Sequence, residues 1–133
     1  MLLVKTVLKK SKTHGIGLFA AEFIPKGTVT WKYSEEFDTS YPLNCIDRMP
    51  EHTMRRFLDW AYHDINRKKY ILCFDDQRFI NHSDNPNIQS TPDMDTAKKD
   101  IEKGEELTCN YEDYEKGWFK NRGIKKTSFK STS

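Results

Sequence analysis

The chain has 133 residues and a net charge of +2, with 36% hydrophobic and 32% charged residues. This length is typical of one domain, and the composition indicates a soluble globular protein that can bury a core. The sequence excludes a membrane span, because no stretch approaches the ~18 apolar residues that one requires. The apolar start at residues 1–4 is interrupted by Lys5, which argues against a signal peptide.

The first predicted elements are a strand, a loop, a turn and a second strand, at residues 2–8, 11–17, 25–27 and 28–33. In the second strand, Val29, Trp31 and Tyr33 fall on one face and should point the same way. Residues 34–48 are polar and irregular.

An apolar stripe at helical spacing predicts a helix from Pro50 to about Tyr62, and Pro50 suits its first turn. The stripe consists of Met54, Phe57, Leu58 and Ala61. Further short strands are expected at residues 70–74, near 88, near 97 and at 107–111. Many short strands, one clear helix and long loops indicate an α+β domain that is mostly β.

Cys45, Cys73 and Cys109 are scattered and odd in number, which argues against a disulfide framework. Such a set is typical of a reducing compartment, so we expect an intracellular protein of the cytoplasm or nucleus. No two of them have C-x-x-C spacing, so we expect no metal, although a zinc site that includes His82 stays open.

Residues 117–133 carry five positive charges and no acid, which leaves a net charge of −3 on the rest of the chain. We divide the chain into a domain at residues 1–119 and a basic tail at 120–133. The favoured interpretation of the tail is a solvated terminus, and the alternative is contact with nucleic acid or an acidic surface. A mildly acidic body suits a basic substrate such as a lysine-rich peptide.

Residues 15–20 read GIGLFA and match the dinucleotide-binding pattern G-x-G-x-x-A, with Glu35 and Glu36 at a suitable distance for a ribose. That pattern must open a helix of ten or more residues. Pro25 and Gly27 end any helix here within two turns. A nucleotide-binding βαβ unit is therefore rejected.

Two later segments carry polar groups next to apolar ones: residues 78–87 read RFINHSDNPN, and residues 100–111 read DIEKGEELTCNY. By themselves, residues 81–87 are good turn formers, and Tyr33 and Tyr111 are ordinary core aromatics. However, Asn81 and His82 follow an apolar pair and should lie at the edge of the core. Buried polar groups there need partners, which a bound ligand with amino, carboxylate and purine groups would supply.

Taken in order, these three segments resemble the SET domain, the fold of one large class of protein lysine methyltransferases. The resemblance covers about residues 14–114. It implies small β-sheets around a pseudoknot, in which the segment before Tyr111 threads beside Asn81 and His82. The compact size is similar to that of stand-alone members of the family, and the flanking cysteine-rich zinc segments are absent.

The resemblance also implies a site for S-adenosylmethionine. The implied cofactor-binding residues are Gly15, Ile16, Gly17, Asn81, His82, Tyr111 and Trp118. The implied catalytic residues are Tyr111 and Tyr33, and Tyr33 and Cys109 belong to the implied lysine channel. Because the zinc segments are absent, Tyr114, Trp118 and Phe119 are the candidates that would close this channel. Trp118 has an equally good interpretation as core. Cys109 stands where the family usually has Phe or Tyr, which leaves the number of methyl groups added open.

These residues predict transfer of a methyl group from S-adenosylmethionine to the ε-amine of a protein lysine, with histone tails as the first substrates to consider. A lysine amine is protonated in water, because its pKa is about 10.4. A narrow aromatic channel and a nearby sulfonium both favour the neutral amine, so no general base is required. The alternatives are a SET-like module that binds peptide or cofactor without turnover, and a nucleic-acid-binding protein that acts through residues 117–133.

Overall fold

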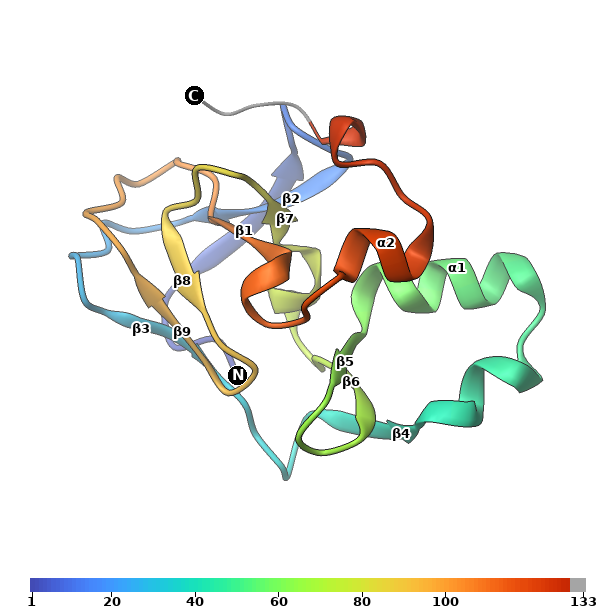
Figure 1. The fold of residues 1–133 in the computed structure, drawn as a ribbon. Coiled ribbons are helices and arrows are strands. Elements are labelled where there is room, and N and C mark those ends of the chain that lie inside the picture. The colour runs from blue at the N-terminus through green and yellow to red at the C-terminus, as the bar shows by residue number, and fades with distance from the viewer. Residues whose placement is uncertain (130–133) are drawn as a thin grey trace.

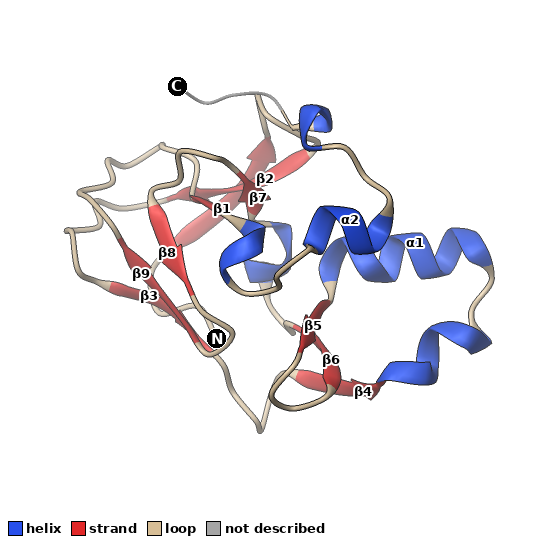
Figure 2. Cartoon of the chain, viewed as in Figure 1, coloured by secondary structure: helices blue, strands red, loops and turns tan. Residues whose placement is uncertain are grey.

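The computed structural model describes residues 1–129, which form four small β-sheets with short helices between them (Figures 1 and 2). The strands are β1 (Thr6–Lys10), β2 (Ile16–Ala20), β3 (Val29–Lys32), β4 (Thr39–Pro42), β5 (Tyr62–Asp64), β6 (Lys69–Leu72), β7 (Asn81–His82), β8 (Ile88–Ser90), β9 (Met94–Ala97) and β10 (Thr108–Cys109). The helices are α1 (Glu51–Trp60) and α2 (Trp118–Arg122), with 3₁₀ turns η1 (Leu43–Arg48), η2 (Asp76–Phe79), η3 (Tyr111–Asp113) and η4 (Lys126–Ser128). The expectation of a mostly-β α+β fold is confirmed.

The GIGLFA segment forms strand β2, which pairs antiparallel with β1. Gly15 has a φ of 48° and lies just before the strand, where a left-handed conformation turns the chain at little cost for glycine. No helix opens here, in agreement with the rejection of a nucleotide-binding unit. The first strand begins later than expected, because Leu2 is instead joined to Trp31 by an isolated bridge.

Strands β3, β9 and β8 form a sheet in that order, and both pairs are antiparallel. The register of β3 shifts between Val29 and Trp31, as a β-bulge does. Thr30 and Trp31 are consequently both buried, with 2% exposure each. The expected alternation of one buried and one open face in this strand is therefore wrong.

The third sheet has the order β4-β6-β5, and α1 lies beside it (Figure 1). The expected helix at residues 50–62 is confirmed as α1, which follows Pro50 directly. Phe57 of α1 packs edge-on against Tyr41 and Tyr70 of the sheet, with ring centroids 5.2 and 5.7 Å apart. Residues 34–48, expected to be irregular, contain β4 and η1.

Strands β7 and β10 are distant in sequence and pair in parallel, with Thr108 opposite Asn81 and Cys109 opposite His82. The side chain of Asn87 extends this pairing, because its amide donates to the Glu106 carbonyl and accepts from the Thr108 N–H. This threading confirms the expected pseudoknot. The strand expected at residues 107–111 ends at Cys109, and Tyr111 begins η3.

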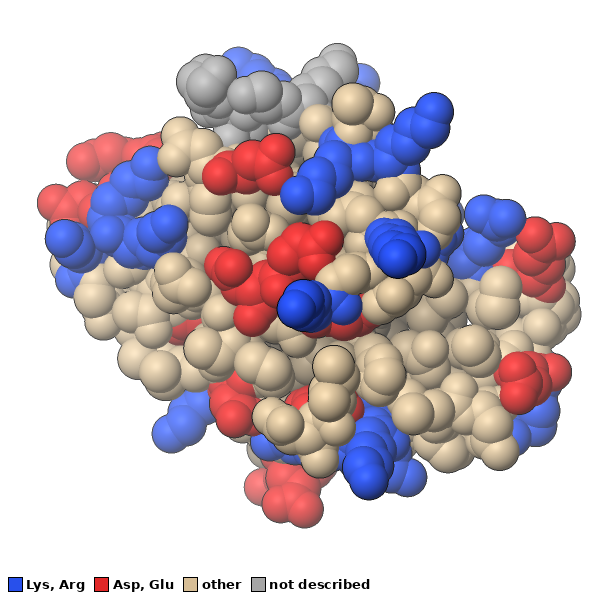
Figure 3. Space-filling model, viewed as in Figure 1, with Lys and Arg blue, Asp and Glu red and all other residues tan. Residues whose placement is uncertain are grey.

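The main core lies between β2, β8 and the C-terminal segment, and it includes Leu18, Ile88, Leu107, Trp118 and Phe119. Acidic and basic side chains are interspersed over the face shown in Figure 3. Among residues 1–129, no helix has the length and apolar character that crossing a bilayer demands.

Candidate active site

Two cavities meet at Tyr111, which lines both of them together with Asp59, Trp60, Arg78 and Ile80. The outer cavity has a volume of about 150 Å³ and the inner one about 40 Å³. The outer cavity therefore has room for a bulkier ligand than the inner one. A ligand in one cavity would lie next to a ligand in the other at Tyr111.

The outer cavity is formed by the β1–β2 turn, strand β7, helix α2 and the segment after η4. From the predicted cofactor residues it takes Gly15, Ile16, Asn81, Tyr111 and Trp118. Phe129 also lines it, and the ring of Phe129 stacks on His14 at 4.3 Å between centroids. Backbone groups, one amide and several aromatic rings thus face one space.

Asn81 holds the β1–β2 turn in place. Its Nδ2 donates to the carbonyl oxygens of His14 and Ile16, at 2.8 and 3.3 Å, and to the Glu106 carboxylate at 2.9 Å. The same carboxylate fixes Gly17, because a Cβ added at Gly17 would lie 2.4 Å from Oε2 of Glu106. Gly17 does not line the outer cavity, so its place in the motif follows from close packing.

His82 supports Tyr111 from behind the outer cavity. Its Nδ1 accepts the backbone N–H of Tyr111 at 3.1 Å, and its Nε2 lies 2.9 Å from Oδ1 of Asp84. The ring of Phe119 meets the His82 ring edge-on at 4.7 Å. Burial lowers the pKa of His82, an effect larger than the opposing hydrogen bond to Asp84, so the neutral ring is favoured.

The hydroxyl of Tyr111 donates to the carbonyl oxygen of Ile80, at the wall shared by the two cavities. Its ring packs against Trp118, with centroids 4.6 Å apart. Burial raises the pKa of Tyr111 well above the ordinary tyrosine value. Tyr111 therefore remains a neutral hydroxyl that can orient a ligand.

Five aromatic residues contribute to the walls of the inner cavity: Trp31, Trp60, Tyr62, Tyr111 and Tyr114. Tyr62 and Tyr114 meet edge-on at 5.3 Å, and the Tyr62 hydroxyl donates to the carbonyl oxygen of Pro92. Six polar or charged side chains also line it: Asp59, Gln77, Arg78, Ser90, Thr91 and Asp95. Aromatic walls beside the buried carboxyl group of Asp95 form an environment that can bind and desolvate an amine.

The structure brings most predicted site residues to the cavities but leaves three channel candidates away from them. The ring of Tyr33 lies under the Arg67 guanidinium at 3.9 Å and lines neither cavity. Cys109 is 0% exposed and lines neither cavity. Phe119 packs on His82, whereas Tyr114 does line the inner cavity.

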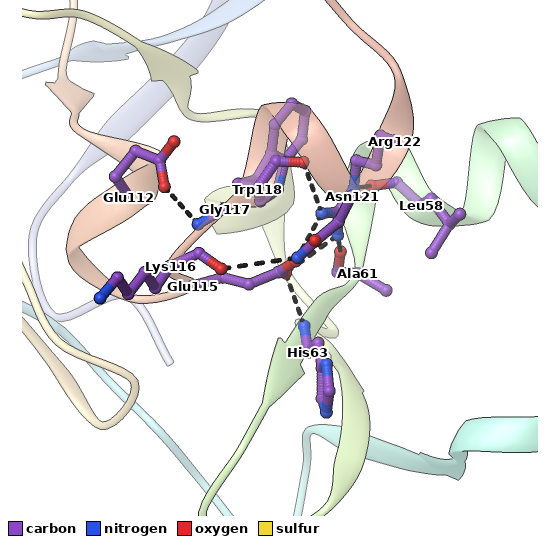
Figure 4. Close-up of polar contacts among 10 residues, drawn as sticks. All are labelled: Leu58, Ala61, His63, Glu112, Glu115, Lys116, Gly117, Trp118, Asn121 and Arg122. Atoms are coloured by element: carbon purple, nitrogen blue, oxygen red, sulfur yellow. Dashed lines mark hydrogen bonds and ion pairs between the residues drawn. The ribbon is translucent and has the colours of Figure 1, made fainter.

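A buried ion pair joins the C-terminal segment to the end of α1 and to β5 (Figure 4). Arg122 contacts both oxygens of Glu115, at 2.6 and 3.0 Å, with side chains that are 4% and 2% exposed. Arg122 also donates to the carbonyl oxygens of Leu58 and Ala61, while Glu115 accepts the backbone N–H of His63 at 2.8 Å. This network ties α2 to the end of α1 and to β5.

The expectation of a solvated basic tail from residue 120 is therefore wrong for Arg122, because its charge is neutralised inside the fold. It is also wrong for Phe129, which lines the outer cavity. Residues 130–133, including Lys130, lie outside the described residues. Sequence reasoning missed Phe129 and Arg122, although an aromatic residue within a basic tail was a signal of packing.

In the described part of the chain, no group of three or more His, Cys, Asp or Glu side chains is arranged to hold a metal ion. The three cysteines are free and buried. His82, the residue that a zinc site would need, is committed to Tyr111 and Asp84.

A protein-family model described as SET domain matches residues 15–112. Among solved structures, a humanized mutant of the Chaetomium thermophilum Polycomb Repressive Complex 2 bound to an inhibitor shares 28% identity, over 88% of this chain and 16% of that chain, with a TM-score of 0.60. The autoinhibited ctPRC2 bound to S-adenosylmethionine shares 26% identity over 89% of this chain and 16% of that chain, with a TM-score of 0.62. The chain thus spans a small part of these proteins.

A Plasmodium falciparum protein assigned as a histone methyltransferase has a TM-score of 0.56 and 22% identity, over 83% of this chain and 95% of that chain. This likeness concerns the fold. No curated protein gives a sequence match.

Proposed function

The chain belongs to the SET-domain family, and we propose that it transfers a methyl group from S-adenosylmethionine to the ε-amine of a protein lysine. The observation that carries this proposal is the position of Tyr111 between a wide cavity and a narrow one. The wide cavity would hold the cofactor and the narrow one the lysine side chain. Histone tails are the first substrates to test.

The outer cavity fits the cofactor's groups. The Nε of Arg78 is buried without a hydrogen-bond partner among the described residues, and Arg78 lines this cavity. Such a donor needs an acceptor, which the cofactor's carboxylate would provide. Gly15 and Ile16 present backbone groups, and Trp118 and Phe129 present rings suited to a purine.

When bound, S-adenosylmethionine supplies an electrophilic methyl group, so the protein needs no strong nucleophile of its own. The residues of the inner cavity desolvate the amine, which favours its neutral form. The Tyr111 hydroxyl orients that amine at the wall between the cavities. Such positioning accounts for a large part of the rate when two bound groups react in line.

The test is the Tyr111→Phe variant, assayed for transfer of radiolabelled methyl groups to mixed histones and to proteins of a cell lysate. We expect transfer to fall at least 100-fold, as loss of an oriented polar group at a reacting centre does, while calorimetry shows unchanged cofactor affinity. Tyr41→Phe is the matched control, because Tyr41 packs on Phe57 away from both cavities. Cofactor binding by a wild-type protein that transfers no methyl group would instead favour the alternative of a binding module.

A further inference from the structure

Asp95 is a buried carboxyl group held by two neutral donors. It lies in β9 and is 2% exposed. Ser90 donates its hydroxyl to Oδ1 at 2.6 Å, and Gln77 donates its amide to Oδ2 at 2.7 Å. A carboxylate offers about four acceptor positions, so both oxygens retain capacity for a further donor.

No basic side chain in residues 1–129 forms an ion pair with Asp95. A buried charge without a cation is unfavourable. Burial accordingly raises the pKa of Asp95 to about 6, despite the hydrogen bonds from Ser90 and Gln77, which lower it. Near neutral pH, Asp95 is therefore ionised and lacks a counter-charge.

Asp95, Gln77 and Ser90 all line the inner cavity, together with Tyr111 and Tyr114. Trp31 lines it too, and its Nε1 is buried without a partner in the described part of the chain. Asp95 therefore faces a space in which a ligand can contact it.

This inference rests on the proposed function and names a residue for it. We propose that Asp95 accepts a proton from the substrate's ε-ammonium in the inner cavity, with Gln77 and Ser90 as positioning residues. One N–H bond of the ammonium breaks, an O–H bond forms on the carboxylate, and the nitrogen lone pair becomes free to attack the methyl group. The product leaves as a methylated ammonium, and Asp95 returns its proton to solvent.

The chemistry of the cavity suits this step. An unpaired carboxylate attracts the ammonium into the cavity. The aromatic walls then disfavour the charged form of both groups. Proton transfer from the ammonium to the carboxylate removes both buried charges at once. The titratable or charged side chains that face Asp95 or share the cavity with it are Asp59, Tyr62, Cys73, Arg78, Cys109, Tyr111 and Tyr114. Burial raises the pKa of Cys73 and Cys109 as it does that of Tyr111, so these three groups remain neutral.

The test compares the pH profile of kcat/KM for the wild type with that for Asp95→Asn, which keeps the size of the side chain. The Gln77 amide can rotate to accept from the new amide, so the packing is retained. In the wild type, kcat/KM should rise to a plateau above about pH 6 to 7, because kcat/KM reports ionisation of the free enzyme. In the variant, kcat/KM should be about 100-fold lower at pH 7 and rise tenfold per pH unit up to pH 9, because only amine already neutral in solution reacts.

Asp100→Asn is the matched control, because it removes one carboxylate from an exposed turn, where Asp100 accepts the Lys26 N–H. Its profile should match the wild type. If Asp95→Asn fails to fold, Ser90→Ala answers the same question. Loss of the Ser90 donor raises the pKa of Asp95, so the acidic limb of the profile should move to higher pH. Parallel profiles for the wild type and Asp95→Asn, or an unmoved limb in Ser90→Ala, would overturn the proposal.

A second measurement needs no turnover. In protein labelled with ¹³C at aspartate side-chain carboxyls, the Asp95 signal is the one missing from Asp95→Asn. Its titration midpoint near pH 6 should move to lower pH when n-butylammonium is added. If the midpoint moves but the wild type methylates nothing, the amine site stands and the methyltransferase proposal fails. If methylation occurs and the midpoint stays in place, the role of Asp95 is refuted while the enzyme remains.

Discussion

The backbone N–H of Tyr111 donates to Nδ1 of His82 across a separation of 29 residues. The hydrogen bond requires that Nδ1 carries no proton, so the proton of the neutral ring is on Nε2, facing Asp84. His82 therefore acts on the site through the backbone of Tyr111. The paired strands β7 and β10 bring the two residues together.

Replacing His82 with Ala should leave the Tyr111 N–H buried without a partner. We expect the free energy of unfolding to fall by about 1–3 kcal/mol from this loss, with a further reduction from the lost ring packing on Phe119. His82→Asn is the informative counterpart, because the Asn Oδ1 lies near the place of Nδ1 and can still accept. In urea unfolding, His82→Asn should lose clearly less stability than His82→Ala. Equal losses in the two variants would mean that the hydrogen bond contributes little to stability.

Lowering the pH should reduce the stability of the wild type through protonation of His82. Its folded-state pKa lies below the unfolded value of about 6.5. Below pH 6.5 the unfolded chain therefore takes up a proton that the folded chain resists, and stability falls as the pH decreases towards the folded pKa. The stability of the wild type relative to His82→Asn, measured by urea unfolding from pH 8 to pH 5, should decrease over this window. A constant difference would show that His82 titrates alike in both states.

Asp95 should have the opposite effect on the pH dependence of stability. Its pKa is raised from 3.8 to about 6, so the folded state binds the proton more tightly than the unfolded state. Ionisation of Asp95 then destabilises the fold by on the order of 3 kcal/mol above pH 6, and this effect disappears below pH 4. Asp95→Asn should consequently gain stability relative to the wild type as the pH rises from 4 to 7. Urea unfolding of both proteins across that range measures the gain.

Gly17→Ala should disturb the outer cavity although Gly17 does not line it. The new Cβ would displace the Glu106 carboxylate, which holds Asn81 and, through Oε1, accepts from Ser11 at 2.7 Å. We expect unfolding to become easier by about 1–3 kcal/mol, and cofactor affinity measured by calorimetry to fall at least fivefold. Adding Glu106→Asp, whose shorter side chain can retreat from the Cβ, should restore part of both losses.

Arg122→Met should leave Glu115 buried and uncompensated, at a cost of about 3–5 kcal/mol in unfolding free energy. Changing both residues to apolar ones should cost less than the single change, since no charge is then left alone. The control is Arg55→Met, which breaks the exposed pair with Glu51 and should cost at most about 0.5 kcal/mol. Similar losses at Arg122 and Arg55 in chemical denaturation would contradict the role assigned to the buried pair.

The sequence predicted the elements whose signal is local. The stripe around Phe57 gave the helix, and Pro25 with Gly27 excluded a nucleotide-binding unit. The pairing of β7 with β10 followed from family resemblance, because no local pattern specifies which distant strands meet. Strands β2, β4, β5 and β7 and helix α2 were missed, since each is five residues or fewer and depends on tertiary contacts.

The same distinction holds within the candidate site. Asn81, His82 and Tyr111 belong to motifs that can be read along the chain. Asp95 and Arg122 resemble surface residues in sequence, and their roles arise from partners 18 and 7 residues away, Gln77 and Glu115. The β-bulge in β3 alters which side chains of that strand face inward, and the placement of Tyr33 under Arg67 could not be read from alternation.

The buried pair of Arg122 and Glu115 also has a consequence for how the protein is made. On the ribosome, residues 6–97 can complete three of the four sheets as they emerge, but His63 and the end of α1 still lack the carboxylate and the guanidinium that bind them. The end of α1 gains these partners only when Arg122 has been synthesised and has folded back over it. Until then the backbone N–H of His63 and the carbonyl oxygens of Leu58 and Ala61 lack the partners that they have in the folded chain.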